Sequence, residues 1–307
     1  LTQELSQILQ QPVQMGTLHL TYQQGLAVDI HNLNIGDKKN LDIHVPQMTG
    51  VLRLQPLLMG DFLFDRVVLT EPQLNIVIPE ASGSERREPA VSTTAKLFKR
   101  FGLSLLTIRH ATLDLTEEQP RDKQIPSRIE NLNLVLRGWS AEQTGYLVVS
   151  GVLPEQTGQF TIEADLPTPA QLSDWRQQPL SIKANLKNIS RDLLPETLTQ
   201  HLPEQIDASL RLSGPPVTGS NLYGQISDSL SGNQLLTAEG RWLSADQTDR
   251  IQELQISLFN IPFTGDLQIS RTDDSPQIKG SLKTENIELP SLLKRWSHPQ
   301  AARLVSG

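Results

Sequence analysis

Residues 180–186 read Leu-Ser-Ile-Lys-Ala-Asn-Leu, and residues 206–212 read Ile-Asp-Ala-Ser-Leu-Arg-Leu. In both stretches apolar and polar side chains alternate, which is the pattern of a β-strand with one dry face and one wet face. Parallel α/β proteins show continuous apolar strands separated by long amphipathic helices, and the sequence lacks such helices. The two stretches therefore predict an antiparallel sheet. The pattern alone leaves open whether a second sheet, as in a sandwich, covers the dry face.

The same alternation extends outward from these stretches in both directions along the chain. Short helices interrupt it where apolar residues take helical spacing or a Leu-Leu pair follows a strand, and we predict them at 2–10, 53–60, 95–101, 191–201 and 290–296. The predicted strands are 18–22, 26–30, 41–45, 62–69, 73–78, 105–115, 127–136, 145–153, 159–166, 180–189, 206–212, 222–226, 235–243, 251–258, 262–269 and 278–287.

The chain divides into three predicted parts. Residues 1–80 form an N-terminal β module with a leading helix, and residues 81–95 form a polar linker with no apolar period. Residues 96–307 continue the same sheet as repeated units, because the strand and Leu-Leu turn at 182–194 are echoed at 278–293. In the helix predicted at 95–101, Lys96, Lys99 and Arg100 form either a solvated face or a membrane-surface contact. We expect the Leu97 and Phe101 side of this helix to cap a groove formed by the dry face, between the N-terminal module and the longer sheet.

Composition excludes several classes of protein. The formal net charge is −7 and no basic stripe occurs, which argues against nucleic-acid binding. There are no cysteines, so disulfides, thiolate nucleophiles and cysteine-based zinc sites are excluded. The sequence contains no run of about 18 apolar residues, which is the signal of a membrane-spanning helix. Because the chain starts at Leu1, we expect a processed or truncated piece from which a signal or anchor segment has been removed.

Catalytic signatures are also missing from the sequence. None of the six histidines pairs with another at metal-ligand spacing, and several occupy polar positions of alternating strands. The sequence has no Gly-x-Ser-x-Gly elbow, no phosphate-binding glycine loop and no dinucleotide fingerprint. We therefore expect no enzyme activity, no catalytic residues, no metal and no cofactor.

Both ends of the chain resemble a known family in the order and spacing of short stretches. These stretches are Pro12-Val13, Gly16-Thr17-Leu18, Val51-Leu52-Arg53-Leu54, Pro56-Leu57-Leu58-Met59-Gly60, Glu71-Pro72-Gln73-Leu74, Gly265-Asp266-Leu267, Pro276-Gln277-Ile278-Lys279-Gly280 and Ile287-Glu288-Leu289. The pattern resembles the AsmA family, whose members are related to bridge-like lipid transporters. The resemblance implies a repeating β-groove (a β-taco), in which an elongated antiparallel sheet curls into an open trough.

The resemblance also implies a function, location and partners. We expect a lipid-binding or lipid-transport scaffold in the periplasm that holds phospholipid acyl chains between inner and outer membranes, anchored to the inner membrane in the full-length protein. The alternatives are an outer-membrane protein assembly factor or a structural spacer that acts through its sheet edge. The expected groove lining is Leu18, Leu20, Leu26, Val28, Leu180, Ile182, Ala184, Leu186, Ile206, Ala208, Leu210, Leu212, Leu267, Ile269, Ile278 and Leu282.

Overall fold

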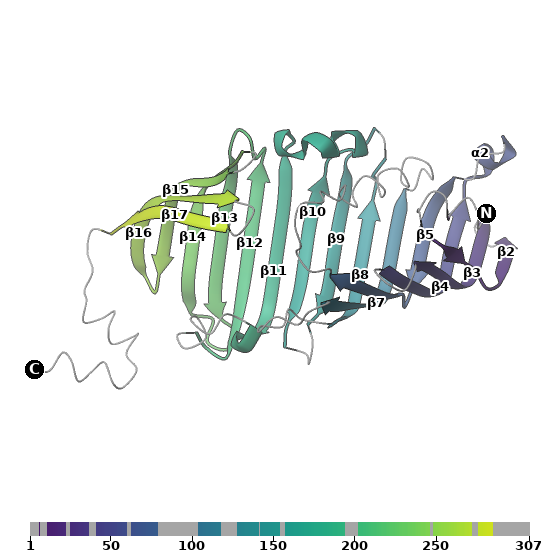
Figure 1. Ribbon diagram of the computed structural model, residues 1–307, viewed down its shortest axis with the longest axis horizontal. Helices are drawn as coiled ribbons and strands as arrows, with labels where there is room; N and C mark the ends of the chain where they lie inside the picture. The colour runs from purple at the N-terminus through teal and green to yellow at the C-terminus, as the bar shows by residue number, and fades with distance from the viewer. Residues whose placement is uncertain are drawn as a thin grey trace, which may run out of the picture. The chain divides into compact units, whose positions relative to one another are not determined.

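The computed structural model is mainly β, and its described residues form 17 strands in one mixed sheet with few helices (Figure 1). The mainly-β prediction is therefore confirmed. The structure describes residues 6, 11–22, 25–36, 41–59, 63–78, 104–117, 128–140, 142–153, 157–193, 202–245, 248–271 and 276–284. These residues fall into two compact units, 1–185 and 186–307, which are taken in turn below.

The first unit is built mostly from neighbouring antiparallel strands. Strand β3 pairs with β1, β2 and β4, and β8 and β10 both pair with β9. Its elements are β1 (Val13–Gln14), β2 (Leu18–Tyr22), β3 (Leu26–Gly36), β4 (Leu41–Leu52), α2 (Leu54–Leu58), β5 (Phe64–Thr70), β6 (Gln73–Ile78), β7 (Leu105–Glu117), β8 (Arg128–Arg137), β9 (Gly145–Val152), β10 (Gln159–Leu166), the 3₁₀ helix η2 (Pro169–Gln177) and the first part of β11 (Leu180–Ser190).

Strand β7 departs from the antiparallel prediction. It pairs in parallel with β5 and then with β6, whereas β4 pairs antiparallel with both. Strands β5 and β6 thus lie end to end along one line of the sheet, interrupted at Glu71 and Pro72, where Glu71 has φ 52°. A parallel pair needs a connection of about a dozen residues or more. Residues 79–104 connect β6 to β7, so chain length permits the parallel return.

The second unit is a succession of antiparallel neighbours, in which each strand from β12 to β16 pairs with the next along the chain. Its elements are the second part of β11, the 3₁₀ helix η3 (Arg191–Leu193), β12 (Gln205–Gly214), β13 (Ser220–Asp228), β14 (Gln234–Ser244), β15 (Thr248–Leu258), β16 (Ile261–Arg271) and β17 (Pro276–Lys283). Consecutive pairing is what short turns between alternating strands favour.

One feature recurs inside strands of both units. It is a stretch of four residues in which the first and last are apolar, the second is polar and the third has left-handed φ. An example is Ile30-His31-Asn32-Leu33. Register shifts accompany it where β7 meets β8 and where β15 meets β16, so it forms a β-bulge there. The extra residue lets two apolar side chains three positions apart share the dry face. The residues concerned are Asn32, His110, Asn131, Asn188 and Glu253.

Three of these left-handed residues are stabilised from the neighbouring strand. A bulge leaves a backbone N–H outside the regular ladder, and such a group needs a partner. The N–H of His110 donates to Asn133 Oδ1 (3.1 Å), that of Asn188 to Asp207 Oδ1 (2.8 Å), and that of Glu253 to Asp266 Oδ1 (3.1 Å). The same polar cap therefore supports bulges in both units.

Several predicted elements can be compared with the structure. The strands predicted at 73–78 and 159–166 are found at those bounds, and α2 lies within the helical turn predicted at 53–60. Helix η2 was not predicted. Of the helix predicted at 191–201 the structure describes η3, and of the one at 2–10 only Ser6. The linker at 81–95, the capping helix at 95–101 and the helix at 290–296 lie outside the described residues.

Candidate functional site

In the second unit, strand register places all the predicted lining residues of β12, β16 and β17 on one face of the sheet. Residues directly opposite each other in an antiparallel pair project to the same face. Leu212 lies opposite Leu222, Ile251 opposite Leu267, and Ile269 opposite Ile278. The apolar residues of this dry face are Ile206, Ala208, Leu210, Leu212, Leu222, Ile226, Leu236, Ala238, Trp242, Ile251, Leu254, Ile256, Leu258, Ile261, Phe263, Leu267, Ile269, Ile278 and Leu282. The same register places Ser220, Asp228, Ser244 and Asp249 on this face, near strand ends.

The first unit has a dry face of the same kind. Leu18 lies opposite Ile30 and Leu20 opposite Val28, while Leu26 pairs with Tyr22. The face continues through neighbouring pairs, which include Val67 with Leu106, Leu136 with Leu147, and Ala164 with Leu147. On β11, Leu180, Ile182, Ala184 and Leu186 alternate with polar residues and so project to one side of that strand.

The two dry faces differ in how far their own side chains cover them. In the first unit, Val67, Leu136 and Trp139 form one buried cluster, and Val13, Ile30, Leu33 and Val45 form another. Both clusters found among the described residues lie in this unit. In the second unit, the buried aliphatic side chains within the described ranges are Ile189, Ile206 and Leu254.

Exposure of the predicted lining residues follows this difference only in part. In the second unit Leu186, Leu210, Leu282 and Ile278 are 37%, 44%, 50% and 69% exposed, and Ala208, Leu212, Leu267 and Ile269 are half-buried. In the first unit Leu180 is buried, and Leu26, Val28, Ile182 and Ala184 are half-buried, but Leu18 and Leu20 on β2 are exposed. Large apolar side chains that remain in water on one face are typical of interaction surfaces.

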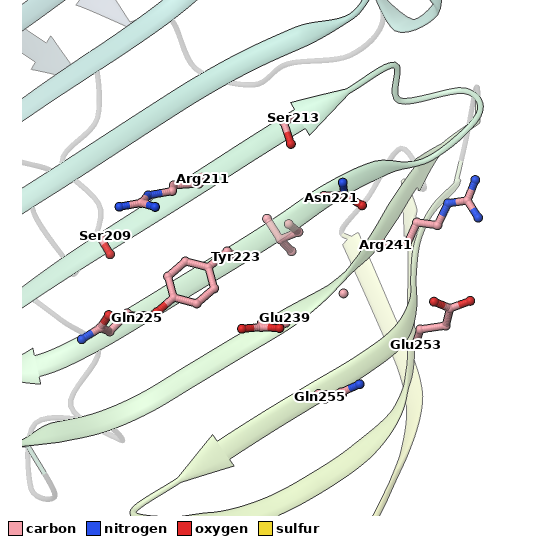
Figure 2. Close-up of a pocket in the computed structure, with 12 residues that line it drawn as sticks. Ser209, Arg211, Ser213, Asn221, Tyr223, Gln225, Glu239, Arg241, Glu253 and Gln255 are labelled. Atoms are coloured by element: carbon pink, nitrogen blue, oxygen red, sulfur yellow. Dashed lines mark hydrogen bonds between the residues drawn. The ribbon is translucent and has the colours of Figure 1, made fainter.

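A second candidate site lies on the opposite, wet face of the second unit, and sequence reasoning missed it. Four neighbouring strands, β12 to β15, surround a hollow of about 600 Å³ (Figure 2). We call it the wet-face hollow. Leu222 and Gly240 form part of its lining. The other ten lining residues have polar side chains: Ser209, Arg211, Ser213, Asn221, Tyr223, Gln225, Glu239, Arg241, Glu253 and Gln255.

The two arginines of the wet-face hollow make side-chain contacts with their surroundings. The Arg211 guanidinium carbon lies 6.0 Å from the centre of the Tyr223 ring, and the Tyr223 hydroxyl donates to Gln225 Oε1 at 3.0 Å. Arg241 donates to the backbone carbonyl of Thr218 outside the hollow. Within the described residues, neither Glu239 nor Glu253 forms an ion pair with either arginine.

Two polar groups elsewhere on the sheet have shifted pKa values. Hydrogen bonds from the Ser231 hydroxyl (2.6 Å) and the Leu230 N–H (2.9 Å) lower the pKa of Asp228 below its ordinary 3.8, because they stabilise the carboxylate. In the first unit, the Tyr146 hydroxyl donates to Glu163 Oε2 at 2.9 Å, and this bond raises the pKa of Tyr146. Tyr146 is exposed and Asp228 is half-buried, and each shift comes mainly from a hydrogen bond to a nearby group.

The described residues contain no group of three or more His, Asp or Glu side chains placed to hold a metal ion. None of the described helices is long and apolar enough to cross a membrane.

Comparisons of the chain with known protein families, with curated proteins and with solved structures found no match. The resemblance to the AsmA family therefore stays a prediction from the sequence.

Proposed function

We propose that this protein is a lipid-binding scaffold whose second unit holds acyl chains against its dry face. The observation that carries the proposal is a continuous apolar face across β12 to β17 on which Leu210, Ile278 and Leu282 stay exposed. The first unit covers much of its dry face with its own side chains, so the second unit is the better candidate for the binding surface.

The energetics favour an apolar ligand there. Each buried methylene contributes about 0.8 kcal/mol, so an acyl chain of about 16 carbons contributes on the order of 10 kcal/mol when it is fully desolvated. The hydrocarbon tail of an acyl chain has no hydrogen-bonding groups, and it can lie across several strands without leaving a polar atom unpaired. A flexible apolar ligand of this kind therefore suits a face formed by Leu and Ile side chains.

The resemblance to the AsmA family supports a more specific proposal. Under this proposal the scaffold lies in the periplasm, is anchored to the inner membrane in the full-length protein, and holds or transports phospholipids between the two membranes. The assembly-factor and spacer alternatives predict a dry face that carries no lipid. Lipid content of the purified chain therefore separates these hypotheses.

The test compares charge on the two faces at adjacent positions. Leu210→Arg places a cation on the dry face, where it would be desolvated against acyl chains at a cost of several kcal/mol unless it reaches water. Ser209→Arg is the matched control, one residue away on the wet face. After incubation with phospholipid vesicles, mass spectrometry should find lipid on the wild type and on Ser209→Arg but much less on Leu210→Arg. Equal lipid on both variants, with both folded, would contradict the proposal.

A further inference from the structure

The wet-face hollow suggests a second ligand, different from the one proposed for the dry face. We propose that it binds a neutral, hydroxyl-rich glycan. The hollow lies on the reverse side of the same strands that carry Leu210 and Leu212. A ligand there would not compete with an acyl chain for side chains, so the two sites can be tested separately.

The lining selects against an apolar ligand. At about 600 Å³ the hollow lies within the range of roughly 300–1,000 Å³ that is usual for small-molecule sites. Such sites are normally lined by apolar and aromatic residues with few polar groups. Here the proportions are reversed, because amides, hydroxyls, guanidinium groups and carboxylates dominate the lining. A ligand with many hydrogen-bonding groups of its own fits this surface best.

The charges of the hollow select against an ion. Arg211 and Arg241 contribute +2, and Glu239 and Glu253 contribute −2, so the lining has a net charge of zero. An anion such as phosphate would face two carboxylates, and a cation would face two guanidinium groups, so each meets like charge as well as opposite charge. Net attraction is therefore weak for either ion. A neutral ligand that can both donate and accept hydrogen bonds meets no such opposition.

The shapes of the side chains match a sugar ring. A guanidinium group donates two parallel hydrogen bonds and a carboxylate accepts two, so each can engage a pair of adjacent hydroxyls. Figure 2 shows Arg211 and Tyr223 side by side on β12 and β13, with Glu239 on β14. Tyr223 offers an aromatic face for the C–H side of the ring, and its contact with Arg211 and hydrogen bond to Gln225 restrict its motion.

Glu253 supplies a second, independent argument. Left-handed φ inside the strands occurs at Asn32, His110, Asn131, Asn188 and Glu253. Asn and His are several-fold enriched in this conformation, whereas Glu is not. A residue held in such a sparsely populated region is often functional. Of these residues, Glu253 is the one that lines the hollow. We infer that its carboxylate serves ligand binding, although a Glu at this φ lowers the stability of the backbone.

The experiment measures binding of two neutral probes, a tetramer of N-acetylglucosamine and a tetramer of glucose, by isothermal titration calorimetry. We expect saturable binding of at least one probe. Tyr223→Leu and Glu253→Asn should each weaken that binding about tenfold, which corresponds to about 1.4 kcal/mol. Lys279→Gln, on the wet face of β17 outside the hollow, is the control and should bind as the wild type does.

Thermal unfolding separates a binding role from a structural one. Because Asn suits left-handed φ better than Glu, Glu253→Asn should raise the Tm by roughly 1–3 °C while it weakens sugar binding. Leu210→Arg should leave sugar binding unchanged, so failure of the lipid proposal would not affect this result. No saturable binding of either tetramer, wild-type affinity in both hollow variants, or tighter binding of inorganic phosphate than of sugar would each overturn the proposal.

Discussion

The first and second units use the same alternating strands and yet cover their apolar faces differently. In the first unit Trp139 is 5% exposed, and its indole N–H donates to the Pro167 carbonyl at 2.7 Å. Leu172 of η2 also packs against this cluster. In the second unit the dry side chains are mostly half-buried or exposed. The same single-faced sheet is therefore covered by its own side chains in the first unit and is left more open in the second.

The largest effect should follow from removing the centre of the first unit's cluster. Trp139→Ala deletes a buried aromatic side chain and leaves the Pro167 carbonyl without its donor. We expect a loss of about 3–5 kcal/mol in the free energy of unfolding, measured by urea denaturation. Val148→Ala, on the wet face of β9, is the control and should lose less than about 1 kcal/mol. A small effect of Trp139→Ala would mean that the first unit has no self-sufficient core.

A leucine pair tests the comparison directly. Leu136→Ala in the first unit should cost about 2–5 kcal/mol, because Leu136 is buried. Leu212→Ala in the second unit should cost about 1 kcal/mol in the absence of lipid, because Leu212 is half-buried. Added phospholipid should stabilise the wild type, as any ligand of the native state does, and Leu212→Ala should reduce that gain. Equal losses without lipid would contradict the distinction between the units.

The polar caps on left-handed residues should behave alike in the two units, because in both a side-chain oxygen of the neighbouring strand accepts the backbone N–H. Asp207→Ala removes the acceptor for the Asn188 N–H, and Asn133→Ala removes the one for the His110 N–H. Each should cost about 1–2 kcal/mol, because a backbone donor loses its partner near the surface. Hydrogen exchange at the two N–H groups is the measurement. Unchanged exchange at either group would mean that water replaces the cap without loss.

The smallest effect concerns the turn between β13 and β14. The pKa of Asp228 is lower in the folded chain than its ordinary 3.8, so its contribution to stability is present above pH 3.8 and is lost as pH falls through the folded pKa. Asp228→Asn should therefore lower the Tm at neutral pH, and the difference from the wild type should shrink at pH values well below 3.8. A difference independent of pH would contradict this assignment.

Much of the fold was predictable because alternation reports directly on sheet faces. The pattern at 206–212 placed Leu210 and Leu212 on one face, and the register with β13 agrees. The parallel pairing of β7 could not be predicted in this way, because alternation carries no information about strand direction. Helix η2 was missed because Leu172 and Trp175 are its only large apolar residues, which is too few to show a helical period.

The left-handed residues inside the strands could have been predicted from the sequence, whereas the wet-face hollow could not. One four-residue pattern recurs at 30–33, 108–111, 129–132, 186–189 and 251–254. Its first and last residues are apolar, its second is polar, and its third is Asn, His or Glu. This pattern breaks the period of two by one residue, which is the signal of a bulge. Register shifts mark bulges where β7 meets β8 and where β15 meets β16, whereas at 30–33 the register with β4 is unbroken. The hollow has no such signal, because its lining comes from four strands whose register only the structure supplies.

Photocrosslinking to phospholipid tests the central claim most directly. A p-benzoylphenylalanine at Leu210 or Leu282 would lie on the dry face of the second unit, whereas one at Ser209 would lie on its wet face. One at Leu134 would lie on the dry face of the first unit, against the cluster around Trp139. We predict lipid adducts at Leu210 and Leu282 and few or none at Ser209 and Leu134. Equal adducts at Ser209 and Leu210, or adducts confined to Leu134, would contradict the account.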